Sequence, residues 1–123
     1  MLSNAVDIDW GKVELEPEAI DWYRGLAEVD QGRVEYNVEL LAATGPLLGE
    51  PQTRQLKRKL RELRFTLSSG DWRISYYIAT HRRIILLTAF PKKRGQERAQ
   101  VARAERAMAG CIAAGHTAAE DEP

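Results

Sequence analysis

The sequence predicts an α+β fold in the element order β-α-α-β-β-β-α, with a helical hairpin packed on one face of a small, mainly antiparallel sheet and a C-terminal helix. Apolar residues recur at helical spacing between positions 17 and 44, and alternating or wholly apolar segments follow between 60 and 90. A further helical stripe, mostly alanine, lies between 97 and 113. The 123 residues suffice for one domain, which we expect at 1–114, before an acidic, disordered tail at 115–123.

The N-terminal half is predicted to form one strand and the helical hairpin. Residues 10–15 alternate between apolar and polar types, which is typical of a strand. Pro17 favours the start of a helix, because the first turn does not need its missing N–H. We expect Asp30–Gly32 to break that helix and a second helix to run over 33–44, where Gly45–Pro46 stops it.

The C-terminal half is predicted to form three strands and a helix. The glycine and proline residues in 45–53 indicate a loop before the first of these strands. The strands are expected at 60–67, 72–79 and 83–90, and the last should be interior because it is apolar on both faces. A helix is predicted at 97–113, with small side chains on its packed face.

Acidic and basic residues are segregated along the chain, although the 18 of each sign cancel overall. Residues 1–53 hold eleven acidic and three basic residues, whereas residues 54–106 hold fifteen basic and four acidic ones. This pattern predicts a surface for a polyanion in the second half of the chain. The alternative is that two faces of opposite charge are simply solvated.

Composition excludes several classes of protein. With 44% hydrophobic and 29% charged residues, the chain is neither a disordered tail nor a fibrous repeat. Its longest apolar run is too short to cross a bilayer, and its acidic start is unlike a secretory signal, so we expect a cytoplasmic protein without a membrane partner. One cysteine and two distant histidines (Cys111, His81 and His116) predict no disulfide, no metal site and no cofactor.

Three groups of basic residues converge on the predicted sheet face that points away from the helical hairpin. Arg64 and Arg73 occupy outward positions on adjacent strands, and Lys92 and Lys93 leave the end of the third strand beside them. Guanidinium groups form bidentate contacts with phosphate, and lysines add mobile positive charge. We therefore predict a site for single-stranded nucleic acid centred on these four residues. A single outward arginine is usually only a solvated charge, so the convergence carries the prediction.

Further contacts with RNA are expected from the residues around this centre, which are Lys57, Arg58, Lys59, Arg61, Tyr77 and Arg94. The ring of Tyr77 could stack on a base, and its position also makes it the candidate for assisting proton transfer. Such a face could cleave RNA without a metal, because the 2′-hydroxyl supplies the nucleophile and the protein stabilises charge at the phosphorus.

Three segments stand in a fixed order along the second half of the chain: LKRKLRELR at 56–64, WRISYY at 72–77, and LLTAFPKKRGQERAQVARAERA at 86–107. Together they resemble the HigB-like, phage-derived branch of the RelE/ParE toxin superfamily. Its members typically have an L-x-E-L-R stretch, a strand of the form Y/W-R-I-x-Y, and a strand ending in F-x-K-K before an alanine-bearing helix.

This resemblance implies a RelE-like fold and a toxin of a type II toxin–antitoxin pair, which cleaves translated mRNA in the ribosomal A site without a metal. It implies the ribosome, mRNA and a small antitoxin of the helix-turn-helix type as partners. Arg64, Arg73, Lys92 and Lys93 match the family's functional basic residues, which orient mRNA and stabilise the phosphorane. The sequence departs from its relatives in having no tyrosine after Tyr77 and no histidine at the motif positions.

Two other functions remain open, because one scaffold can host several activities. A ParE-like protein would inhibit DNA gyrase and leave RNA intact. A non-catalytic regulatory module would only hold phosphates, which salt-sensitive binding without cleavage would indicate.

Overall fold

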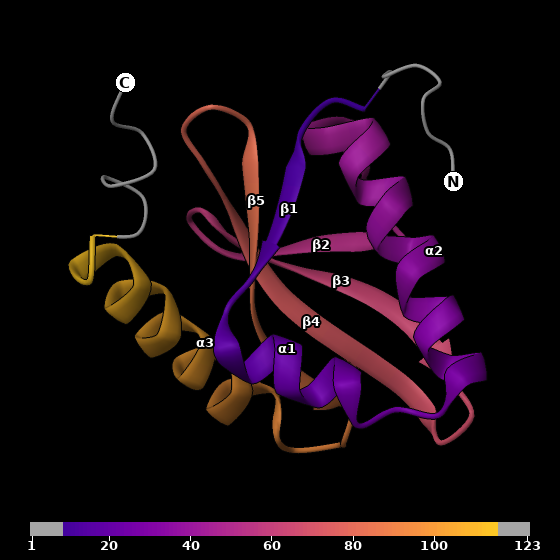
Figure 1. The fold of residues 1–123 in the computed structure, drawn as a ribbon. Helices are drawn as coiled ribbons and strands as arrows, with labels where there is room; N and C mark the ends of the chain where they lie inside the picture. Colours follow the sequence, from indigo (N-terminus) through magenta and orange to yellow (C-terminus); the bar gives the residue numbers. More distant parts are fainter. Residues whose placement is uncertain (1–8, 116–123) are drawn as a thin grey trace.

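Figure 1 shows a sheet with helices packed around it, in a computed structural model that describes residues 9–115, and the sheet has five strands. The strands are β1 (Lys12–Leu15), β2 (Thr53–Lys57), β3 (Leu60–Leu67), β4 (Gly70–Ala79) and β5 (Arg83–Pro91). The helices are α1 (Pro17–Arg24), α2 (Glu28–Thr44) and α3 (Glu97–Ala113), and a 3-10 turn over Gly45–Leu47 follows α2. The tail predicted at 115–123 lies outside the described residues, except for its first residue.

The sheet has the strand order β1-β5-β4-β3-β2. β1 pairs with β5 in parallel, and every other neighbouring pair is antiparallel. The predicted α+β fold with a mainly antiparallel sheet and a C-terminal helix is therefore confirmed. β5, which is apolar on both faces, lies between β1 and β4 as its composition predicted.

The alternation of side chains along β3 and β4 divides the core into two layers. Leu63 and Ile74 are opposite each other on the face covered by α1 and α2. Leu60 and Tyr77 lie in the other layer, under α3. Ala104 of α3 is fully buried there, because its small side chain lets the helix approach the sheet closely.

The predicted helix break at Asp30–Gly32 is wrong, because these residues lie within α2. The chain instead leaves α1 at Gly25, whose N–H bonds back to the last turn of that helix. Asp30 is buried in the first turn of α2, where its carboxylate accepts hydrogen bonds from the backbone N–H and hydroxyl of Ser68, both at 3.0 Å. The local preference of these residues favours a break, but the tertiary contact to the β3–β4 turn stabilises them as part of a helix.

One strand, β2, was absent from the prediction, which treated residues 45–53 as a loop and placed the next strand at residues 60–67. β2 is mostly polar and lies at the edge of the sheet, so it lacks the apolar alternation that marks buried strands. Its hydrogen bonds to β3 decide its conformation.

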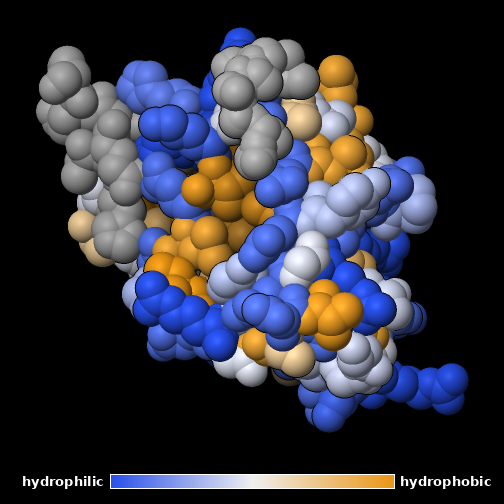
Figure 2. Space-filling model, turned by 45° about the vertical axis from the view of Figure 1, so that its right-hand side comes forward, coloured by the Kyte–Doolittle hydropathy of each residue, from blue (hydrophilic) through white to orange (hydrophobic). Residues whose placement is uncertain are grey.

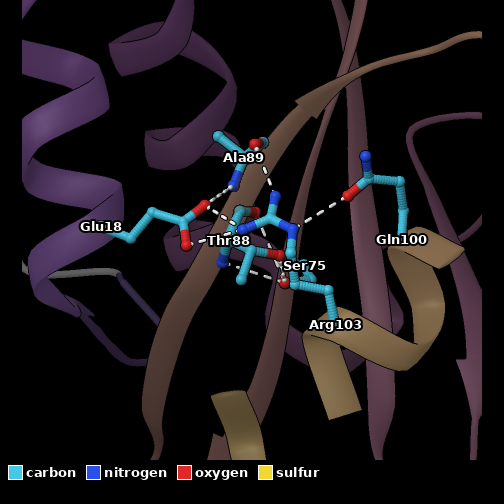
Figure 3. A network of polar contacts seen from close by, with 6 residues as sticks. All are labelled: Glu18, Ser75, Thr88, Ala89, Gln100 and Arg103. Carbon is cyan, nitrogen blue, oxygen red and sulfur yellow. Dashed lines mark hydrogen bonds and ion pairs between the residues drawn. The ribbon is translucent and has the colours of Figure 1, made fainter. Parts of the chain in front are cut away.

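Side chains from two helices seal the edge of β5 beyond the end of β1, as Figure 3 shows. Glu18 of α1 accepts a hydrogen bond from the Ala89 N–H at 3.3 Å, and Arg103 of α3 donates to the Ala89 carbonyl at 3.1 Å. The two side chains also form an ion pair, with Arg103 Nη1 2.6 Å from Glu18 Oε2. This bracket, formed by Glu18 and Arg103, supplies hydrogen-bond partners to backbone groups of Ala89 that no neighbouring strand pairs. Its ion pair also links α3 to α1.

Candidate functional site

A basic cleft of about 410 Å³ opens between β3, β4, the segment after β5 and the first turn of α3. Six basic side chains line it, together with two carboxylates and several backbone and polar groups. The basic residues are Arg54, Arg64, Arg73, Lys92, Lys93 and Arg94, and the carboxylates are Glu62 and Glu97. The four residues predicted as the centre of the site are therefore brought together.

The floor of the cleft is a carboxylate shared by two arginines. Arg64 of β3 and Arg73 of β4 are directly opposite each other in the antiparallel register, where two like charges repel. Glu62 Oε2 lies 3.2 Å from Arg64 Nε and 3.5 Å from Arg73 Nε. The single negative charge offsets this repulsion and fixes both guanidinium groups from one side.

Arg73 is the more buried of the two arginines, and burial reduces the hydration of its guanidinium group. Its side chain is only 10% exposed, against 25% for that of Arg64. Loss of hydration lowers the pKa of Arg73 from its ordinary value, while the nearby charge of Glu62 opposes that change. Arg73 Nη1 donates a hydrogen bond to the Trp72 carbonyl at 3.1 Å. Arg73 is thus a fixed, partly dehydrated cation in the cleft wall.

The mobile charge of the cleft comes from the segment that leaves β5. The backbone N–H of Lys92 donates to the Asp71 carbonyl at 2.9 Å, which anchors this segment beside the start of β4. The side chains of Lys92, Lys93 and Arg94 are exposed, and none of them forms an ion pair with a residue in 9–115. These three charges remain available to an anionic ligand.

The opposite rim is formed by β2 and α3. Arg54 Nη2 lies 3.0 Å from Glu97 Oε2, with the arginine side chain 41% and the glutamate side chain 66% exposed. An ion pair this exposed contributes little to stability and opens readily to an anion. Because Arg103 and Glu18 hold α3 in place, they also set the position of this rim.

Comparison with known proteins places the chain in a family. Residues 15–109 match the sequence profile of the family described as phage derived protein Gp49-like, and this segment includes every residue that lines the cleft. The chain belongs to the Gp49-like family. A search of curated protein sequences finds no significant match.

The Gp49-like chain has the fold of the E. coli toxin RelE, whose structure was solved for a mutant in the free state. The TM-score is 0.54 at 12% sequence identity, and the match covers 76% of this chain and 92% of RelE. At this identity the similarity concerns the fold alone. The expected RelE-like fold is confirmed, whereas the resemblance to the HigB-like branch stays a prediction.

The structure of this Gp49-like protein separates the other predicted RNA-contacting residues from the cleft, with the exception of Arg94. Arg61 lies on the opposite face of the sheet, where it donates hydrogen bonds to the Tyr76 hydroxyl at 3.2 Å and to Thr53 Oγ1 at 3.0 Å. Its odd position in β3 places it with the apolar side chains under α2, so Arg61 does not face the cleft, and its contact with RNA stays a prediction.

Tyr77 also lies away from the predicted interface. Its side chain is 2% exposed beneath α3, where its hydroxyl donates to Cys111 Sγ at 3.3 Å. The prediction identified its face of the strand correctly but assumed that this face was open. Because α3 covers it, Tyr77 can neither stack on a base nor reach a ligand in the cleft. Cys111 is itself buried, and burial raises the pKa of its thiol.

Three further basic residues do not line the cleft: Lys57, the last residue of β2, and Arg58 and Lys59 in the turn between β2 and β3. Lys57 Nζ lies 3.1 Å from a carboxylate oxygen of Glu105 in α3. Arg58 adopts a positive φ of 53° in this turn, and Lys59 is exposed. The charges of these three residues therefore lie outside the cleft.

Glu62 and Arg54 are among the cleft residues that the sequence prediction missed. Glu62 shares the outward alternation of Arg64, two residues away, and that spacing was the available signal. Arg54 could not be placed because its strand, β2, was not predicted. Within residues 9–115 no three His, Cys, Asp or Glu side chains cluster as metal ligands, and no helix there is long and apolar enough to cross a membrane.

Proposed function

We propose that this protein is the toxin of a type II toxin–antitoxin pair, of the HigB-like branch, and that it cleaves mRNA on the ribosome. The observation that supports this proposal is the cleft, in which Arg64, Arg73, Lys92 and Lys93 surround one opening. Membership of the Gp49-like family and the fold shared with the toxin RelE support it further. Its partners would be the ribosome, mRNA and an antitoxin of the helix-turn-helix type, in the cytoplasm.

The proposed reaction needs no nucleophile from the protein. The RNA 2′-hydroxyl gives its proton to solvent water as its oxygen attacks the adjacent phosphorus, the bond to the 5′-oxygen breaks, and that oxygen gains a proton. The products are a 2′,3′-cyclic phosphate and a 5′-hydroxyl. Negative charge grows on the non-bridging oxygens, where Arg73, fixed by Glu62, and Arg64 would stabilise it. Lys92 or Lys93 would protonate the leaving oxygen, because they are exposed proton donors of the cleft.

The test is translation in vitro of a defined mRNA with the purified protein, with and without ribosomes, followed by primer extension to map new 5′ ends. We expect ribosome-dependent ends whose rate of formation falls about 100-fold in Lys92→Ala. Lys92 suits this test because its exposed side chain forms no ion pair with a described residue, so its removal should leave the fold intact. Lys12→Ala, which removes an exposed lysine of β1, is the matched control and should cleave normally.

Uncut mRNA with normal translation would overturn the proposal. A DNA gyrase supercoiling assay would then test the ParE-like alternative. RNA binding that weakens with salt, without new 5′ ends, would indicate the non-catalytic module.

A further inference from the structure

A second opening lies on the other side of the sheet from the basic cleft, between α1 and α2. It is a groove of about 200 Å³, with Ile74 of β4 and Leu86 of β5 at its base and Trp22 and Val38 among the helix residues that line it. Figure 2 shows apolar side chains gathered in a hollow bordered by hydrophilic ones on the side of the molecule where these helices lie.

Two carboxylates, Glu35 and Glu39, are the charged groups that line this groove. They are one turn apart on α2, so they lie on the same side of the helix. Both are exposed, and neither forms an ion pair with a residue in the described part of the chain. Glu35 accepts a hydrogen bond from the Tyr23 hydroxyl, which leaves its charge uncompensated. The groove is thus apolar inside and negative at its rim.

The interior of the groove has room for a side chain. A dry cavity of about 150 Å³ can hold a benzene molecule, so this volume suits one bulky aliphatic or aromatic group. The indole N–H of Trp22 is buried and has no hydrogen-bond acceptor among the described residues. An isolated buried donor of this kind is costly, and Trp22 is one of the residues that line the groove.

We infer that this groove binds a segment of another protein that carries a bulky apolar side chain flanked by lysine or arginine. The apolar side chain would fill the groove, and the flanking cations would pair with Glu35 and Glu39. A second copy of this chain fits poorly, because a symmetric dimer that buries this groove brings two negative rims into the same interface. The inference needs neither RNA nor cleavage, so it stands or falls separately from the proposed function.

Synthetic peptides and isothermal titration calorimetry test this inference on the full chain. The probe is a helical peptide with one leucine between two lysines, each a helical turn away. The first control peptide has serine in place of the leucine, and the second has glutamate in place of both lysines. We expect the probe to bind and each control peptide to bind at least about 10-fold more weakly. The basic cleft cannot mimic this result, because it repels a cationic peptide.

Protein variants assign the binding to the groove. Glu39→Lys should weaken binding of the probe about 5-fold or more, and it should not disturb the fold because this exposed side chain has no polar partner among the described residues. Glu50→Lys, which reverses an exposed charge away from the groove, should change the affinity less than 2-fold (about the error of the measurement).

Three results would overturn the inference. They are absence of binding by the leucine–lysine peptide, equal binding of the serine peptide, and equal effects of Glu39→Lys and Glu50→Lys. Concentration-dependent dimerisation that Glu39→Lys abolishes would also overturn it, since the occupant would then be a second copy. Binding of the peptide by a protein that cuts no mRNA would refute only the proposed function.

Discussion

Replacing Glu62 by glutamine removes the one negative charge that two arginines of the cleft share, while keeping the size of the side chain. The side chains of Glu62 and Arg73 are 7% and 10% exposed, so the ion pair between them is buried. Removing one partner of a buried ion pair costs about 3–5 kcal/mol. Arg64 is better hydrated, and the glutamine oxygen can still accept a hydrogen bond. We therefore expect the free energy of unfolding to fall by about 2–3 kcal/mol.

For a domain of this size the loss corresponds to a fall in Tm of roughly 10 °C, measured by circular dichroism. Glu97→Gln is the matched control, since it removes the same group from an ion pair whose glutamate is 66% exposed. That variant should lose less than about 1 kcal/mol. The double variant Glu62→Gln with Arg73→Met should recover part of the lost stability, because it no longer leaves a buried arginine without its counter-charge.

Equal shifts of Tm in Glu62→Gln and Glu97→Gln would refute this reasoning, because burial would then make no difference to the two ion pairs. A double variant whose losses simply add would refute it as well, since the two side chains would not be coupled. The same experiment bears on how the site can be studied. Arg73 was predicted to point outward, but it is buried beside Glu62, so the stability of Arg73→Ala must be measured before its activity is interpreted.

Four further substitutions test the fold at separate points. Gly32→Ala should raise the free energy of unfolding by about 0.5–1 kcal/mol in urea melts, since no atom lies within 4 Å of the added Cβ and alanine favours the helix. Gly45→Ala should lower it by more than about 2 kcal/mol, because φ is +66° and the new Cβ would lie 2.4 Å from the Trp10 ring; a neutral result would contradict the close approach. The backbone N–H of Ser68 holds the pKa of Asp30 below its usual value, so the stability from this carboxylate is complete at neutral pH and is lost as the pH falls through the lowered pKa. Asp30→Asn should therefore be less stable than the parent protein at about pH 7, and the difference in stability should shrink in melts at acid pH. A difference that does not change with pH would contradict this linkage. Arg103→Ala should speed amide hydrogen exchange at the start of α3 and cost about 1 kcal/mol, and unchanged exchange would show that the bracket does not hold the helix.

Local pattern was sufficient for four of the five strands, all except β2, and for the direction of their side chains. Alternation over residues 60–79 predicted which side chains of β3 and β4 share a face, because successive residues in a strand point to opposite sides. The predicted bounds of α3 match the structure. The predicted break in the helices failed, since Asp30 makes its decisive contact with Ser68, 38 positions away.

What packs over a face could not be deduced from alternation. The face that carries Arg64, Arg73 and Tyr77 was predicted to be open, whereas α3 covers one end of it and leaves the other as the cleft. The same predicted face therefore contains a buried tyrosine and a site for an anion. Strand β2 was missed for a related reason, because an edge strand takes its conformation from its neighbour rather than from its own apolar pattern.

The sequence by itself determined that Arg64 and Arg73 lie on one side of the sheet, because successive side chains in a strand point to opposite faces. Only the tertiary structure decided that Glu62 stands between the two arginines, that Arg54 joins them and that Arg61 and Tyr77 do not. The partners of a charged side chain depend on strand register and on the elements packed above it, and both arise from contacts between residues far apart in the chain.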